Sequence, residues 1–202
     1  MNRSIILVIL ICIIFLSGCT NENINKKIMV EKKILMVVAP ENFRDEEFLH
    51  PKEIFDRNGI DVVVASKGVK EAKGTYGATA KVDLDIGEVN VSEYDAVVFV
   101  GGSGSSIYYT DTIALNIARE TYNKNKVIGA ICIAPGILAK SGILEGKKAT
   151  IWDSGNREFI KILEEGGAEY TGKNVEQDGK IITANGPHAA REFGERIVDA
   201  LS

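Results

Sequence analysis

The chain has 202 residues, of which 45% are hydrophobic and 26% are charged, the balance of a folded domain rather than of a disordered protein. Its 24 basic and 28 acidic side chains give a formal net charge of -4, so the chain lacks the basic excess typical of nucleic-acid-binding proteins. Two histidines and three cysteines leave little room for a zinc site, which draws several ligands from these two residue types.

The N-terminal segment resembles the leader of an exported lipoprotein. After Arg3 comes Ile5–Leu16, an uninterrupted apolar run that is shorter than the roughly 20 residues that a membrane-spanning helix needs and is typical of a signal peptide. The run leads into Leu16-Ser17-Gly18-Cys19, which resembles the lipobox of bacterial and archaeal lipoproteins. The resemblance implies cleavage before Cys19 and a lipid on its sulfur. An uncleaved hydrophobic anchor is the alternative.

These features divide the chain into three predicted parts. Residues 1–18 form the signal peptide, residues 19–32 carry the lipidated cysteine and a polar linker, and residues 33–202 form the domain. The domain is therefore expected on the extracytoplasmic face of the cell membrane, held there by the lipid. Cleavage and lipidation would leave Cys132 as the only free thiol.

The first half of the domain alternates strand-like and helix-like segments. Ile34–Ala39 and Ile60–Ala65 are short, continuous apolar runs, as expected for strands buried on both faces of a parallel sheet. Between them, Glu46–Asn58 is predicted to be a helix. The glycine-containing stretch Lys67–Val82 predicts an irregular or hairpin excursion, and Tyr94–Val100 predicts a third core strand.

The second half continues the alternation after a glycine-rich turn. The expected elements, in order, are helix Asp111–Asn125, strand Val127–Ile131, helix Pro135–Ser141, strand Ala149–Trp152, helix Arg157–Glu165, hairpin Asn174–Thr183 and helix Ala189–Leu201. This order predicts an α/β fold, a doubly wound sandwich whose sheet is mostly parallel and carries helices on both faces.

Cys132 stands directly between a predicted strand and a predicted helix, in Ile131-Cys132-Ile133-Ala134-Pro135. Ligands of open α/β sheets bind at the carboxyl ends of strands, and this junction resembles a nucleophile elbow. Amides at the start of a helix favour a thiolate, and the backbone amides of Gly102, Ser103 and Ile133 are expected to hold an oxyanion. The alternative is that Cys132 is a small buried apolar side chain.

Four stretches, in this order and spacing, resemble the ThiJ/PfpI superfamily over nearly the whole domain. They are Glu46-Glu47 before Pro51, Val97–Gly102, Ala130–Pro135, and Val175–Thr183 followed by Gly186-Pro187. The resemblance implies a flavodoxin-like fold, a homodimer or higher homo-oligomer and a reactive Cys132. No cofactor or metal is expected. The resemblance places the glutamate of the family at Glu47, which would stay protonated or shuttle protons; the alternative is a solvated residue in the first turn of a helix.

The chain departs from this family where the family has histidines. PfpI-type peptidases have a histidine where this chain has Ile133, and deglycase-type relatives have one at the position of Trp152. His188 is the remaining candidate base, or a surface residue at the last helix. Peptide hydrolysis needs a base and a leaving-group acid, whereas attack on an aldehyde needs only a thiolate and a proton shuttle. We therefore expect a membrane-anchored, cysteine-dependent enzyme that acts on small reactive carbonyls or their protein adducts, as glyoxalases and deglycases do.

Two other functions stay open at this point. A PfpI-type cysteine peptidase would take a peptide as substrate. A non-enzymatic redox-sensing or stress-protective protein would use oxidation of Cys132 to sulfinic acid as its signal, and a catalytically inactive relative is the limiting case. Nucleic acid is not an expected partner for any of them.

Overall fold

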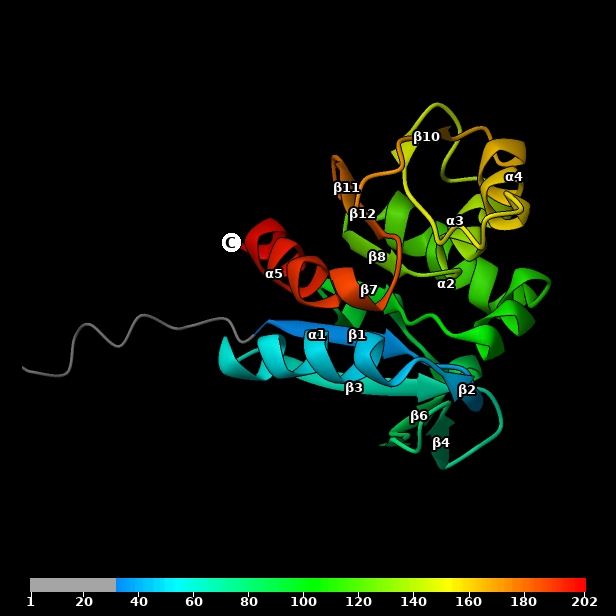
Figure 1. Ribbon diagram of the computed structural model, residues 1–202. Helices are drawn as coiled ribbons and strands as arrows, with labels where there is room; N and C mark the ends of the chain where they lie inside the picture. Colours follow the sequence, from blue (N-terminus) through cyan, green and yellow to red (C-terminus); the bar gives the residue numbers. More distant parts are fainter. Residues whose placement is uncertain (1–31) are drawn as a thin grey trace, which may run out of the picture. The chain divides into compact units, whose positions relative to one another are not determined.

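The computed structural model describes residues 32–202, so the predicted signal peptide and Cys19 lie outside the described residues. A seven-stranded sheet in the order β11-β12-β8-β7-β1-β3-β6 forms the centre of the domain (Figure 1). Neighbouring strands run parallel, except for the antiparallel pair β11 and β12. Its strands are β1 (Lys33–Val37), β3 (Asp61–Ser66), β6 (Leu84–Asp85), β7 (Ala96–Phe99), β8 (Val127–Ile131), β11 (Val175–Asp178) and β12 (Ile181–Ala184). The predicted flavodoxin-like α/β fold is confirmed.

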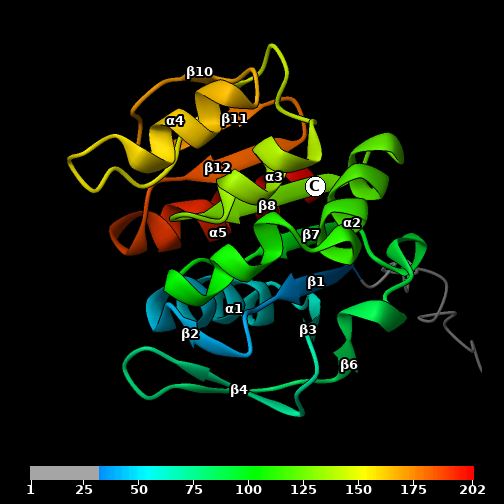
Figure 2. The same cartoon turned by 90° about the vertical axis from the view of Figure 1, so that its right-hand side faces the viewer.

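Helices cover both faces of this sheet (Figure 2). They are α1 (Asp45–Arg57), α2 (Thr112–Asn123), α3 (Pro135–Ser141), α4 (Glu158–Glu165) and α5 (Ala190–Leu201). Strand β1 shows why the sandwich forms. Its side chains alternate between faces, so Leu35 and Val37 pack on the side of α2 and α3, while Ile34 and Met36 pack on the side of α1 and α5. All four are at most 1% exposed, and each contributes roughly 2 kcal/mol through burial of its apolar surface.

The order of the strands positions the functional site. Strand β1 pairs with β3 on one side and with β7 on the other, so the connections that leave β1 and β7 run in opposite directions across the sheet. A crevice opens between such connections at the carboxyl ends of the strands, where ligands of doubly wound folds bind. The turn after β8, which pairs with β7, lies next to this point and carries Cys132.

The predicted excursion over Lys67–Val82 is a hairpin, made of β4 (Glu71–Gly74) and β5 (Thr79–Lys81). A short strand that the sequence pattern did not reveal, β2 (Glu41–Phe43), pairs with β4 and completes a second sheet of three strands. The buried carboxylate of Asp45 accepts hydrogen bonds from the backbone N–H groups of Tyr76, at 3.0 Å, and Ala78, at 2.7 Å. The hairpin turn is therefore tied to the start of α1.

The predicted strand Ala149–Trp152 is wrong beyond its first residue. Strand β9 covers Lys148–Ala149 and pairs with β10 (Glu169–Tyr170) in a separate two-stranded sheet. The next N–H groups are occupied elsewhere: that of Thr150 donates to the Thr183 hydroxyl and that of Trp152 to the Cys132 carbonyl, each at 2.9 Å. A strand ladder consequently stops there. Within residues 32–202, no helix combines the length and apolarity needed to cross a membrane.

Candidate active site

Cys132 occupies a tight turn between β8 and α3, with a backbone φ of 62°. Residues other than glycine rarely adopt this left-handed conformation, and it persists only where neighbouring structure enforces it. Two backbone hydrogen bonds of 2.9 Å do so here: the Cys132 N–H donates to the carbonyl of Ala184, and the Cys132 carbonyl accepts from Trp152. The strand, turn and helix thus have the geometry of a nucleophile elbow, and the thiol is half-buried rather than enclosed in the core.

Glu47 lies in the first turn of α1 with 0% of its surface exposed, so the alternative of a solvated residue is wrong. Neither carboxyl oxygen has a hydrogen-bond partner of standard geometry among the described residues. Burial raises the pKa of Glu47 to about 8, although the Cys132 thiol, the Arg44 guanidinium and the Gly101 amide each act to lower it. The carboxyl group is therefore protonated and uncharged at pH 7.

Gly101 separates the carboxyl group from the thiol. A Cβ atom at this position would lie 2.4 Å from Oε2 of Glu47 and 2.5 Å from both Cβ of Cys132 and the carbonyl oxygen of Ile131. Only a residue without a side chain lets these groups approach each other. The next residue, Gly102, has a φ of 97°, and a Cβ there would lie 2.4 Å from the backbone nitrogen of Arg44. The two glycines together form the floor of the site.

The environment of the thiol differs from the sequence-based expectation. Burial and the negative charge of an ionised Glu47 raise the pKa of Cys132 to about 12, and the backbone amides of Gly102 and Ile133 lower it by less. The amides favour the thiolate, as expected from the sequence, but burial and Glu47 outweigh them and the pKa is raised overall. The charge of Glu47 raises the pKa of Cys132 only when Glu47 is ionised, and this contribution disappears when Glu47 carries its proton. The ionisation of the thiol is therefore coupled to that of the carboxyl group.

A cavity of about 370 Å³ opens above the thiol, a volume suited to a small molecule. It is lined by Arg44, Glu47, Thr75, Gly102, Ser103, Cys132, Ile133, Trp152, Phe159 and Pro187. The structure therefore brings together the predicted Cys132, Glu47, Gly102, Ser103 and Ile133. Sequence reasoning missed Arg44, Thr75 and Phe159, which lie just before α1, in the turn of the β4–β5 hairpin and in α4, and share no motif. The only available signal was for Arg44, which precedes Glu47 by three residues, close to one helical turn.

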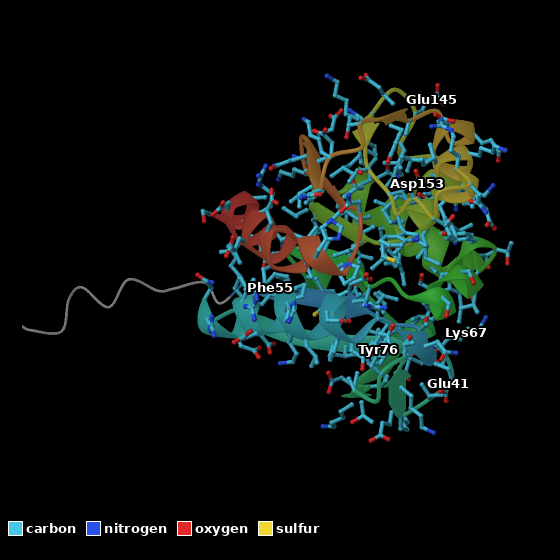
Figure 3. The ribbon with its side chains drawn as sticks, viewed as in Figure 1. Glu41, Phe55, Lys67, Tyr76, Glu145 and Asp153 are labelled. Atoms are coloured by element: carbon cyan, nitrogen blue, oxygen red, sulfur yellow. The ribbon has the colours of Figure 1, made fainter. Side chains whose placement is uncertain are left out.

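His188 does not join this group. Its side chain is exposed, its Nε2 lies 3.2 Å from Oδ1 of Asn174, and within residues 32–202 no histidine lines the cavity. The Trp152 ring lines it instead, with 37% of the residue exposed. In Figure 1 the arrow of β1 points toward the carboxyl end of the sheet. Figure 3, drawn in the same view, shows Tyr76 and Asp153 on that side; they are the sequence neighbours of the cavity-lining residues Thr75 and Trp152.

Tyr109 holds the elbow through a hydrogen bond to its backbone. Its hydroxyl donates a hydrogen bond of 2.7 Å to the carbonyl of Ile133, and burial raises its pKa. Gly136 makes room for this ring, since a Cβ there would lie 2.6 Å from it. No group of three or more His, Cys, Asp or Glu side chains within residues 32–202 is arranged to hold a metal ion.

Comparison with known proteins identifies relatives of the whole domain. The model of the DJ-1/PfpI family matches residues 32–200. An uncharacterized protein of Methanocaldococcus jannaschii is 40% identical over 202 residues, covering 100% of this chain and 98% of its own. Deglycase PfpI of Pyrococcus furiosus is 34% identical over 157 residues, covering 77% of this chain and 90% of its own. The crystal structure of a ThiJ/PfpI domain protein from Brachyspira murdochii superposes with a TM-score of 0.79 at 32% identity, covering 85% of this chain and 97% of its own.

Proposed function

The chain belongs to the DJ-1/PfpI family, and we propose that it is a cysteine-dependent enzyme that acts on small reactive carbonyls or on their adducts with proteins. The observation that carries the proposal is the meeting of the Cys132 thiol with the buried, protonated carboxyl group of Glu47 under a small cavity. The Pyrococcus furiosus relative, named a deglycase, supports this class of substrate.

The first step on a 2-oxoaldehyde is addition of sulfur to the aldehyde carbon. At pH 7 both groups carry a proton, and Cys132 reacts after its thiol proton has left to solvent. The resulting thiolate is held by the amides of Gly102 and Ile133, while Glu47 keeps its proton. As the C–S bond forms, the carbonyl electron pair moves to oxygen, which takes the proton from Glu47. The product is a hemithioacetal, and Glu47 is left as a carboxylate ready to act as a base.

The second step is an internal redox exchange that needs no cofactor. The Glu47 carboxylate removes the proton from the carbon that bears sulfur, and the electron pair moves to the ketone oxygen, giving an enediolate. The hemithioacetal hydroxyl passes its proton to that oxygen, and Glu47 then returns the proton it removed to the neighbouring carbon. The former aldehyde carbon becomes a thioester and is oxidised, while the neighbouring ketone carbon becomes an alcohol and is reduced. Water then hydrolyses the thioester, which releases a 2-hydroxy acid and restores the Cys132 thiol.

A peptidase is the weaker candidate for this site. Hydrolysis of a peptide requires protonation of an amine leaving group, usually by an imidazole paired with the nucleophile. His188, the only candidate for that role, faces Asn174 and does not line the cavity. Carbonyl chemistry needs only the two side chains that the site brings together.

Turnover of methylglyoxal by the purified protein tests the proposal. We expect many turnovers per chain, none by Cys132→Ser, and a loss of about 100-fold in Glu47→Gln because the proton shuttle is removed. His188→Ala is the matched control and is expected to keep the wild-type rate. Stoichiometric oxidation of Cys132 by peroxide without any turnover would instead identify a redox sensor and contradict the proposal.

We propose further that the enzyme is anchored to the membrane by a lipid on Cys19, which only the sequence supports. The support is the apolar run Ile5–Leu16 followed by Leu16-Ser17-Gly18-Cys19. The expressed protein is expected to enter the detergent phase in a detergent partition experiment, and Cys19→Ser to move it to the aqueous phase. A wild-type protein that keeps residues 1–18 and stays aqueous would contradict this. Sedimentation of the same sample tests the homo-oligomer that the family resemblance implies.

A further inference from the structure

We propose that the cavity above Cys132 selects carbonyl compounds that also carry a carboxylate, with Arg44 as the residue that binds the carboxylate. The inference rests on the proposed function and deepens it by naming the class of substrate. Arg44 is the only lysine or arginine among the residues that line the cavity within the described part of the chain. A cavity with a single cation and a neutral Glu47 favours an anionic ligand.

A backbone hydrogen bond holds Arg44 next to the residues that carry the reacting groups. The Arg44 N–H donates a hydrogen bond of 3.0 Å to the carbonyl of Gly101, the residue that separates Glu47 from Cys132. The charge of the guanidinium reaches the site, since it acts to lower the pKa of Glu47. A carboxylate bound by Arg44 would therefore lie close to the carbon that Cys132 attacks.

The guanidinium is oriented before any ligand arrives. Nε donates to Glu46 at 2.8 Å, Nη1 donates to the hydroxyl of Tyr76 at 2.8 Å, and the group lies 4.5 Å from the centre of the Tyr76 ring. A third, longer bond joins Nη2 to Glu46 at 3.3 Å. An arginine has five N–H donors, so about two of them stay available for a ligand. Because the side chain is already ordered, binding costs little conformational entropy.

The partner of Arg44 in this stack is itself fixed. Tyr76 lies in the turn of the β4–β5 hairpin, and its backbone N–H donates to the buried carboxylate of Asp45 at 3.0 Å. Thr75, in the same turn, lines the cavity beside Arg44. Arg44 and Thr75 therefore form one polar wall of the cavity, whose position depends on Tyr76 and Asp45.

Glu46 limits the strength of this wall. Its carboxylate forms the ion pair with Arg44 and has a side-chain exposure of 38%, so it partly cancels the positive charge offered to a ligand. Replacing it with glutamine keeps an oxygen that accepts from Nε and removes the charge. Glu46→Gln is therefore expected to bind a carboxylate more tightly, the opposite of the effect expected for Arg44→Gln.

The cavity also has apolar lining residues, which provide the means of detection. They include Trp152, Phe159 and Pro187. Trp152 is the only tryptophan in the chain, so its fluorescence reports occupancy of the cavity without background. A ligand that carries both a carboxylate and an apolar group could contact Arg44 and these apolar residues together.

The test is a fluorescence titration of the full-length protein with phenylacetate and with phenylacetamide, its uncharged analogue. Neither probe reacts with a thiol, so the result does not depend on catalysis. We expect phenylacetate to bind about tenfold more tightly in the wild-type protein, as for one charge-assisted contact. Arg44→Gln is expected to bind both probes equally, Arg44→Lys to keep part of the preference, and Glu46→Gln to increase it. Arg57→Gln, an exposed arginine at the end of α1, is the control and is expected to match the wild-type protein.

Equal affinities for the two probes in the wild-type protein, or a preference that survives Arg44→Gln, would overturn the inference. The unchanged affinity of phenylacetamide in Arg44→Gln shows that the variant has kept its fold. Turnover of methylglyoxal without any preference between the probes refutes only this inference. A preference for phenylacetate without turnover refutes only the proposed function.

Discussion

Replacing Glu47 with glutamine is expected to remove most of the pH dependence of the protein's stability between about pH 5 and pH 8. Burial raises the pKa of this carboxyl group from 4.5 to about 8 in the folded protein. The folded state therefore keeps a proton that the unfolded chain has already released. The resulting stabilisation is complete below the unfolded pKa and is lost as the pH rises toward the folded pKa.

The magnitude follows from the size of that difference. Each pH unit between the two pKa values is worth about 1.4 kcal/mol, so the wild-type protein is expected to lose about 3 kcal/mol of unfolding free energy by pH 7 and about 4 kcal/mol by pH 8, relative to pH 4.5. Glu47→Gln has no proton to release and loses none of this. At alkaline pH the variant is expected to be the more stable protein, even where catalysis has failed.

Urea unfolding at pH 5.5, 7 and 8.5, followed through Trp152 fluorescence, measures these slopes. Glu120→Gln is the matched control, since it removes a partly exposed carboxylate that does not act on Glu47. Its stability is expected to fall with pH as steeply as that of the wild-type protein. Parallel slopes for the wild-type protein and Glu47→Gln would refute the conclusion that burial keeps Glu47 protonated.

Three further predictions concern the elbow and its neighbours. Gly101→Ala is expected to destabilise the protein by about 2 kcal/mol or more in urea unfolding and to abolish turnover, since its Cβ would lie 2.4 Å from Oε2 of Glu47; Gly87→Ala, on ordinary backbone, should cost less. Tyr109→Phe is expected to cost about 1 kcal/mol and to slow turnover, because a 2.7 Å hydrogen bond to the elbow is lost; equal kinetics would contradict this. Alkylation of Cys132 by iodoacetamide is expected to be slow at pH 7, where the raised pKa of the thiol leaves little thiolate, and to accelerate above pH 9. Glu47→Gln should alkylate faster than the wild-type protein above pH 8, and an unchanged rate would contradict the electrostatic coupling.

The fold was largely predictable from the sequence because its strands are buried on both faces. Runs such as Ile34–Ala39 are continuous and apolar for that reason, and the element order then restricts the topology. The pattern failed at Thr150–Trp152, which continues the strand-like run of β9 in the sequence but directs its N–H groups to the Thr183 hydroxyl and the elbow. Nothing local distinguishes such a segment from a strand.

The elbow was the part of the site that the local sequence made predictable, while Glu47 was reached only through the family resemblance. Cys132 was found because a strand, a reactive residue and a helix follow one another within a few residues. The burial of Glu47 and the cavity-lining position of Arg44 depend on the packing of α1 against the glycine turn, which no spacing in the sequence encodes. The raised pKa of Cys132 was not predictable for the same reason. Burial and the nearby Glu47, which come from packing, outweigh the local amides that the sequence showed.

The central claim is that Cys132 forms a covalent bond to a carbonyl carbon and that Glu47 moves the protons. Mass analysis of a quenched reaction with methylglyoxal tests it directly. Glu47→Gln is expected to accumulate an adduct of one methylglyoxal per chain, located on Cys132, while the wild-type protein releases lactate and Cys132→Ser shows neither. Lactate formation by Cys132→Ser, or adducts confined to lysine and arginine side chains, would contradict the mechanism.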